Sequence, residues 1–200
     1  MRRPVPPAVP RAVPRAVLRV AAGAAITTPI MAAIAVLTGQ PLVFPSLGPT
    51  AYLLFATPTQ PAASPRNTLS GHLVGVLSGA AGLAAFGLWH TPADIEHMTW
   101  ARAGAATLAL TLTCGGMVWT GWAHPPAGAT TLIVALGILR TPMQLLDVLV
   151  GVFVLTAFGA MFNRLTGIAY PLWAPIQANR PPVAAEEPPA APARRSEPAA

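Results

Sequence analysis

Two short apolar segments of this sequence begin with residues that could bind a small ion. Each starts with proline and glycine and then carries a threonine, and the second also starts with a histidine. The residues concerned are Ser46, Gly48, Thr50, His124, Gly128 and Thr130. A helix N-terminus has unpaired N–H groups and about half a positive charge, and glycine lets a ligand approach the backbone. The two helix starts therefore predict a binding site for a small anion.

Further polar residues flank these segments and extend the predicted anion path. Arg66 and Asn67 precede a long apolar segment, His72 lies just inside that segment, and Arg140 follows the second short run. The arginines could attract or pair with anions, and His124 could titrate near neutral pH. A protonated His124 would strengthen anion binding, and a proton could travel with the anion.

Structural roles are alternatives for several of these residues. Arg66 and Arg140 could serve only as anchors at the membrane surface, and Asp147 could do no more than pair with Arg140. His72 could simply form a hydrogen bond to a neighbouring loop. An ionisable group at membrane depth is costly, which favours a functional role for His124.

The composition places the chain in a lipid bilayer. Hydrophobic residues make up 54% of it and charged residues only 9%, against about 25% charged in a soluble domain. The net charge of +6 lies on the flanks, because five arginines lie at or before residue 19, near the start of the first apolar segment. This distribution predicts a multi-pass protein of the inner (plasma) membrane with both termini in the cytoplasm. It does not match the basic, aromatic-rich surface that binds nucleic acid.

Four segments are long enough to cross a bilayer, which takes about 20 residues in a helix. They are residues 17–38, 69–88, 102–119 and 143–162. The short runs at 45–56 and 124–136 are predicted to be half-helices. The predicted fold is therefore an all-α membrane protein with a transmembrane domain at 17–165. Residues 1–16 form a disordered basic leader and residues 177–200 a disordered tail rich in proline and alanine.

The two halves of the domain, about 17–90 and 99–165, resemble each other. Residues 45–50 align with 125–130 at an offset of 80, sharing proline, glycine and threonine at equal spacing. If the short helices are re-entrant, the chain crosses four times and the repeats are parallel. If they cross the membrane, the count is six and the repeats are inverted. Four crossings are favoured here.

Residue types required for catalysis or cofactor binding are scarce. A phosphate-binding loop of the Gly-x-x-x-x-Gly-Lys type is excluded because the chain has no lysine. The few carboxylates are scattered, and His90 and His97 lie in one loop without a third metal ligand. We therefore expect no enzymatic activity, no cofactor and no metal site.

Three motifs in order carry a family resemblance. They are His-Pro-Pro-Ala-Gly-Ala-Thr at 124–130, Phe-Pro-Ser-Leu-Gly-Pro-Thr-Ala at 44–51, and Pro-Arg-Asn-Thr-Leu-Ser-Gly-His-Leu-Val-Gly at 65–75. Together they resemble the HPP family of integral membrane proteins over residues 17–165. That family is usually described with four transmembrane segments, and some members are linked to nitrite transport in chloroplasts and cyanobacteria. The resemblance implies nitrite as a substrate.

The function expected from these observations is a membrane transporter or channel for a small inorganic anion, with nitrite favoured. The alternative is a membrane scaffold or assembly protein that transports nothing. In that case the glycines at 71, 75 and 79, which line one helix face, would pack against partner helices. Self-association into a homo-oligomer is left open.

Overall fold

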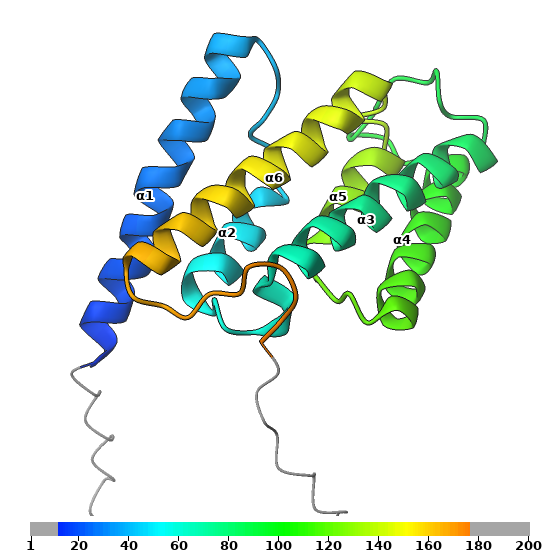
Figure 1. Cartoon of the computed structure of the whole chain (residues 1–200). Coiled ribbons are helices and arrows are strands. Elements are labelled where there is room, and N and C mark those ends of the chain that lie inside the picture. Colours follow the sequence, from blue (N-terminus) through cyan, green and yellow to red (C-terminus); the bar gives the residue numbers. More distant parts are fainter. Residues whose placement is uncertain (1–11, 177–200) are drawn as a thin grey trace, which may run out of the picture.

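The computed structural model describes residues 12–176, and in this part of the chain all regular structure is helical. The helices are α1 (Ala12–Thr38), α2 (Leu47–Ala56), η1 (Pro61–Ala63), α3 (Pro65–Ala85), α4 (Trp100–Thr120), α5 (Ala127–Ala135) and α6 (Pro142–Leu165). Four of them, α1, α3, α4 and α6, are long and apolar enough to cross a membrane. The predicted class, with four long helices and two short ones, is confirmed (Figure 1).

The long helices begin at capping residues that lie upstream of the first apolar residue. Thr141 caps α6 in a capping box with Gln144, and Pro142 occupies the first turn. Ser64 caps α3 in the same manner, accepting a hydrogen bond from the backbone N–H of Asn67. Caps satisfy N–H groups that have no partner within the helix. The predicted starts at 69 and 143 were therefore four residues and one residue late.

The basic leader was predicted to extend to residue 16, but α1 begins at Ala12. Residues 12–16 are thus helical, because prolines in a first helical turn cost no hydrogen bond. Residues 1–11 of the predicted leader and the predicted tail at 177–200 lie outside the described residues.

Each long helix runs from one end of the bundle to the other, whereas α2 and α5 begin in its middle (Figure 1). After α1, residues 39–46 run back in an extended conformation to the middle of the bundle, and α2 continues to the end at which α3 begins. Residues 121–126 and α5 make the corresponding passage in the opposite direction. The four long helices are the ones long enough to cross a membrane on their own, and the re-entrant placement of the short helices stays a prediction. Extended chain covers up to about 3.3–3.6 Å per residue, so a short helix with an extended lead spans as much as a long helix.

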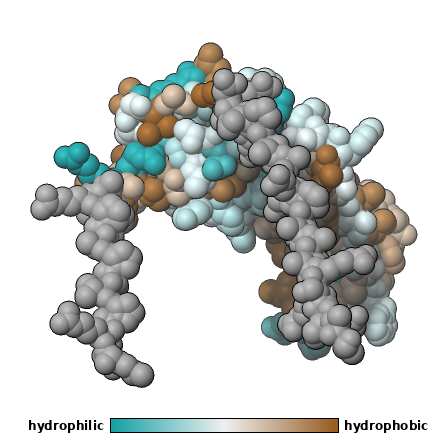
Figure 2. Space-filling model, turned by 90° about the horizontal axis from the view of Figure 1, so that it is seen from below, coloured by the Kyte–Doolittle hydropathy of each residue, from teal (hydrophilic) through white to brown (hydrophobic). Residues whose placement is uncertain are grey.

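Hydrogen bonds show which helix ends lie together. At one end, Arg19 of α1 donates to Asn163 of α6, and Asn163 donates to the carbonyl of Leu54 in α2. At the other end, Arg102 of α4 contacts the carbonyl of Ala135, the last residue of α5. Both described termini lie at the first end. Viewed from there, the surface carries hydrophilic patches among hydrophobic ones (Figure 2).

The third α-helix of each half packs against the other half. Helix α3 contacts α4 and α5, whereas α6 contacts α1 and α2, and α3 and α6 touch each other. Glycines make the α3–α5 contact close. A Cβ atom on Gly71, Gly75 or Gly79 would lie 2.7 Å from His124 Cβ, 2.8 Å from the Ala127 carbonyl or 2.6 Å from Val134 Cβ. The predicted packing role of this glycine face is thus confirmed, with α5 as its partner.

Candidate functional site

Five buried polar side chains meet where the two short helices begin, and we call them the hydroxyl–histidine cluster. They come from α2, α3, α5 and the segments directly before α2 and α5, and each is at most 1% exposed. The members are Ser46, Thr50, His72, His124 and Thr130. All five were among the predicted site residues. Buried polar groups require hydrogen-bond partners, and here they supply one another.

The cluster forms one continuous chain of hydrogen bonds. Ser46 Oγ lies 2.7 Å from Thr130 Oγ1, which lies 2.7 Å from His72 Nδ1. On the other side of its ring, His72 Nε2 lies 3.0 Å from Thr50 Oγ1. Thr50 Oγ1 is 3.2 Å from His124 Nε2, and His124 Nδ1 is 2.6 Å from the Ala62 carbonyl. The two imidazole rings are 4.9 Å apart.

The chemistry of the end groups fixes the direction of this chain when both histidines are neutral. A carbonyl only accepts, so His124 Nδ1 donates to Ala62 and its Nε2 accepts from Thr50. Thr50 then accepts from His72 Nε2–H, and His72 Nδ1 accepts from Thr130. Thr130 in turn accepts from Ser46. Every donor and acceptor is thus used once, in the order Ser46, Thr130, His72, Thr50, His124, Ala62.

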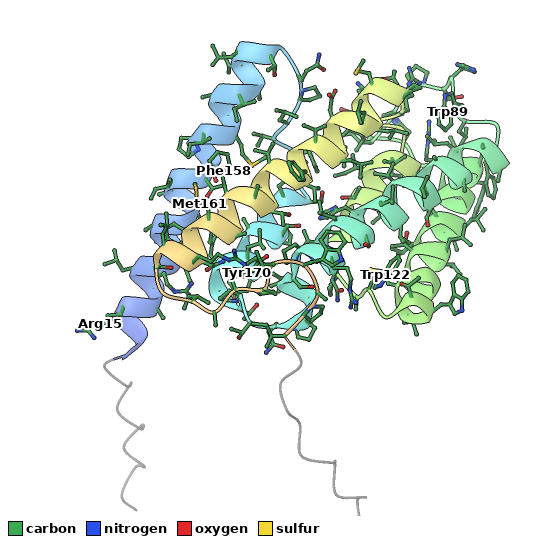
Figure 3. The ribbon with its side chains drawn as sticks, in the orientation of Figure 1. Arg15, Trp89, Trp122, Phe158, Met161 and Tyr170 are labelled. Atoms are coloured by element: carbon green, nitrogen blue, oxygen red, sulfur yellow. The ribbon has the colours of Figure 1, made fainter. Side chains whose placement is uncertain are left out.

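The Ala62 carbonyl is held in place from outside the transmembrane helices. Tyr170, which follows α6, donates from its hydroxyl to the neighbouring carbonyl of Ala63 in η1 (Figure 3). Burial raises the pKa of Tyr170, so this hydroxyl stays protonated and remains a donor. The short η1 helix therefore presents Ala62 to His124 in a fixed position.

The helix starts themselves differ from the predicted anion site. The first backbone N–H groups of α2 donate to the carbonyls of Phe44 and Pro45, and those of α5 donate to the carbonyls of His124, Pro125 and Pro126. These N–H groups are not free for a ligand. The donors that reach the interior belong to the side chains of the hydroxyl–histidine cluster.

The two predicted glycines do not line the cluster. Gly48 is exposed and lines an apolar pocket of about 430 Å³ between α1 and α2, and Gly128 faces Leu110 of α4. Residues two apart on a helix point about 200° from each other. Because Thr50 and Thr130 face the cluster, the glycines two residues earlier face away from it.

Arg66 and Asn67 lie beside the cluster without joining it. Arg66 Nε donates to Asn67 Oδ1, and the Arg66 backbone N–H donates to the Trp173 carbonyl. Asn67 donates from its side chain to the carbonyl of Ala123, directly before His124. These two residues position the segment that leads into the cluster.

Arg140 lies near the end of α5 remote from the cluster, as does Asp147 in the second turn of α6. Among residues 12–176 the ion pair between them that sequence allowed does not form, since the salt bridge found there joins His97 to Asp94. Arg140 Nη1 and Asp147 Oδ2 are both buried without a hydrogen-bond partner. The pairing role is therefore not observed, and the anchor role of Arg140 stays a prediction.

No role was predicted for Arg102 from the sequence. Arg102 is 4% exposed and donates to the carbonyls of Thr91, Pro92 and Ala135. It thus places a cation at the C-terminus of α5, where the helix dipole is negative. A Cβ atom on Gly137 would lie 2.8 Å from the guanidinium, so glycine makes room for it. The sequence signal that could have identified it is an arginine three residues after the cap Thr99, in the first turn of an apolar helix.

Comparisons with known proteins agree with a membrane protein. Residues 9–171 match the family described as HPP, transmembrane region. Two transmembrane proteins of Dictyostelium discoideum are similar: one is 38% identical over 44% of this chain and 25% of its own length, the other 33% identical over 46% and 30%. The chain thus matches less than a third of either relative's length. No solved structure matches the chain. With the family match spanning all six α-helices, the chain belongs to the HPP transmembrane family and is a multi-pass membrane protein.

Proposed function

We propose that the chain is a transporter or channel for a small inorganic anion, not an enzyme, and that the hydroxyl–histidine cluster is its binding site. The observation that carries this proposal is the position of the cluster. Five buried polar side chains lie where two short helices begin in the middle of an otherwise apolar bundle. Transporters built from repeats place their sites on broken helices at the membrane centre. Polar and ionisable residues inside a membrane domain are energetically costly, and their presence there favours a functional role.

An anion would be held by side chains rather than by free backbone groups. Ser46, Thr130 and His72 carry O–H and N–H donors that now satisfy one another. On binding, these donors would turn to the anion, so that hydrogen bonds within the cluster are replaced by hydrogen bonds to the anion. The N-terminal ends of α2 and α5, both directed at the cluster, favour a negative charge. Nitrite, with two oxygen acceptors, is the anion that the resemblance implies.

The proposal includes an inverted internal repeat. Ser46, before α2, contacts Thr130 in the first turn of α5, and Thr50, in the first turn of α2, contacts His124, before α5. The first turns therefore lie antiparallel to each other. The third α-helix of each half packs with the first two helices of the other half: α6 packs with α1 and α2, and α3 packs with α4 and α5. A half-unit that was duplicated and inserted in opposite orientations accounts for this packing and for the antiparallel first turns.

We further propose that both termini face the cytoplasm of the inner (plasma) membrane. The end with the termini also carries Arg66 and Arg164, and the opposite loop carries Asp94 and Glu96, in keeping with the positive-inside rule. Arg102 and Arg140 at that opposite end are exceptions. Trp89 and Trp122 lie at opposite ends of the bundle, where interfacial tryptophans are expected (Figure 3).

The test is nitrite flux into liposomes containing the purified protein. We expect uptake above protein-free liposomes, loss of most uptake in His124→Ala, and no change in His90→Ala, whose side chain is exposed in the loop after α3. Absence of nitrite, nitrate or other small-anion flux in the wild-type protein would overturn the proposal. The scaffold function would then be favoured, and substitutions in the cluster would disturb complex formation instead.

A further inference from the structure

The hydroxyl of Thr50 has two acceptors for its one proton. Thr50 Oγ1 lies 3.0 Å from the Ser46 carbonyl and 3.2 Å from His124 Nε2. A hydroxyl donates one hydrogen bond and accepts up to two. Thr50 can therefore donate either to the carbonyl or to the imidazole, and the choice depends on whether His124 Nε2 carries a proton.

When the Thr50 hydroxyl donates to the Ser46 carbonyl, His124 Nε2 can carry one additional proton. His124 then donates from Nδ1 to Ala62 and from Nε2 to Thr50. Thr50 Oγ1 accepts from both histidines at once, and His72 Nδ1 still accepts from Thr130. Every group remains satisfied after rotation of a single hydroxyl, so the protonated cluster needs no change in the positions of the helices.

A second proton has no such place. It would sit on His72 Nδ1, so that Thr130 could no longer donate there, and it would create two cations with ring centres 4.9 Å apart. Among residues 12–176 no carboxylate hydrogen-bonds either ring. Most charged and titratable groups on the surrounding elements bond elsewhere or are exposed: Arg19, Arg66, Arg102, Arg164, Tyr170, Tyr52 and Cys114. Asp147 is unbonded at one carboxylate oxygen and Arg140 at one guanidinium nitrogen, and both lie near the end of α5 remote from the cluster.

We propose that His72, Thr50 and His124 form a single-proton site that is loaded together with the anion, so that transport is electroneutral with one proton per anion. This inference rests on the proposed function. A lone imidazolium in this buried cluster has no counter-ion, and a lone anion there has no cation, so each is costly alone. Together they form a neutral pair. Anion binding and proton binding therefore strengthen each other by the same factor.

The decisive experiment measures proton and nitrite movement in the same proteoliposomes. A trapped pH-sensitive dye reports protons, nitrite is assayed chemically, and potassium with valinomycin sets the membrane potential. We expect one proton per nitrite, uptake that does not respond to the potential, and nitrite affinity that rises about tenfold for each unit by which pH falls, the slope of one linked proton. Nitrite uptake that is driven by the potential without proton movement would overturn the inference and leave the proposed function standing.

Substitutions at Thr50 test the hydroxyl itself. Thr50→Val keeps the shape and removes the switch, so we expect the proton-to-nitrite ratio and the pH dependence to be lost. Thr50→Ser keeps the hydroxyl and should keep both, and His90→Gln controls for loss of an exposed histidine. A Thr50→Val protein with the wild-type ratio and pH profile would contradict the role of Thr50.

A measurement on the wild-type protein does not depend on transport or on any variant. Nitrogen NMR of labelled histidines should show His124 protonated at Nδ1 and His72 at Nε2 at neutral pH, followed by uptake of one shared proton on acidification. If nitrite flux were absent, the proposed function would fail, but these tautomers would still show whether His72, Thr50 and His124 share one proton. The opposite tautomers, or two independent titrations, would refute it.

Discussion

Ser46 Oγ and Thr130 Oγ1 lie 2.7 Å apart although 84 positions separate them in the chain. The contact joins the start of one short helix to the first turn of the other, and neither helix could bury its hydroxyl alone. Ser46 does not cap α2, since its side chain makes no capping bond. Its hydroxyl instead donates across the bundle, so this residue links the two halves of the molecule.

This link should be measurable as a coupling between the two residues. Thr130→Val leaves His72 Nδ1 without a donor and should cost about 1–3 kcal/mol of unfolding free energy. Ser46→Ala should cost less, because it removes one hydrogen bond at the end of the chain. In a double-mutant cycle of unfolding in mixed micelles we expect a coupling of about 0.5–1.5 kcal/mol. Additive effects would show that the contact contributes nothing to stability.

The passage of α2 across the membrane can be tested by labelling. In a Cys114→Ser background, Gln40→Cys and Gln60→Cys place thiols at two exposed positions on either side of α2. Because α2 joins opposite ends of the bundle, an impermeant thiol reagent should reach these two cysteines from opposite sides of the membrane. Labelling of both from the same side would show that α2 is re-entrant.

The close packing of α3 on α5 predicts a large effect for one added methyl group. Gly75→Ala would place Cβ 2.8 Å from the Ala127 carbonyl and 3.0 Å from Thr131 Oγ1. We expect a loss of about 1–3 kcal/mol in unfolding free energy, since both neighbours are held in α5. Gly115→Ala in α4 is the matched control because a Cβ there meets nothing within 4 Å. It should be neutral or stabilising by up to about 1 kcal/mol.

Removal of the cation at the end of α5 should destabilise the bundle. Arg102→Met leaves three carbonyls without their donor, and we expect a cost of about 1.5–3 kcal/mol in thermal or denaturant unfolding. Arg102→Lys should restore only part of it, because an ammonium lacks the planar fork of donors. The exposed Arg15 serves as control, and Arg15→Met should change stability by less than about 0.5 kcal/mol. Equal effects of the two methionine variants would refute the capping role.

The loop between α3 and α4 should have an acid-sensitive turn. Hydrogen bonds from the backbone N–H groups of His97 and Glu96 lower the pKa of Asp94. A lowered pKa means that the turn is fully formed above the ordinary value of about 3.9 and is lost as pH falls through the lower value. The amide chemical shifts of Glu96 and His97 should therefore stay constant near neutral pH and change only below that value. In Asp94→Ala they should take the low-pH values at neutral pH.

Much of this architecture follows from the distribution of apolar residues. The four long helices and two short ones are dictated by runs of apolar residues between prolines and glycines, and the cluster residues were recognised by their position at helix starts. The direction in which each residue faces was harder to predict. Ser46 and Thr50 are four apart and share a face, whereas Gly48 lies between them and points away. Helical periodicity alone could have excluded Gly48 and Gly128 from the site.

Other features depend on contacts that no local pattern encodes. The passage of residues 39–56 through the bundle depends on an extended segment, which a search for long apolar helices does not detect. Likewise, Arg102 finds its role only because α4 begins where α5 ends. The chain of hydrogen bonds from Ser46 to Ala62 joins residues from four separate segments, and only the folded bundle brings them together.

The exchange of third helices between the halves has a consequence for biogenesis. Helix α2 packs against both α1 and α6, and α6 leaves the ribosome long after α2. The newly inserted first half must therefore wait in the bilayer with the α6-facing side of α2 uncovered until synthesis ends. The hydroxyl–histidine cluster also needs His124 and Thr130 of the second half, so a product truncated after the first half would contain no assembled cluster.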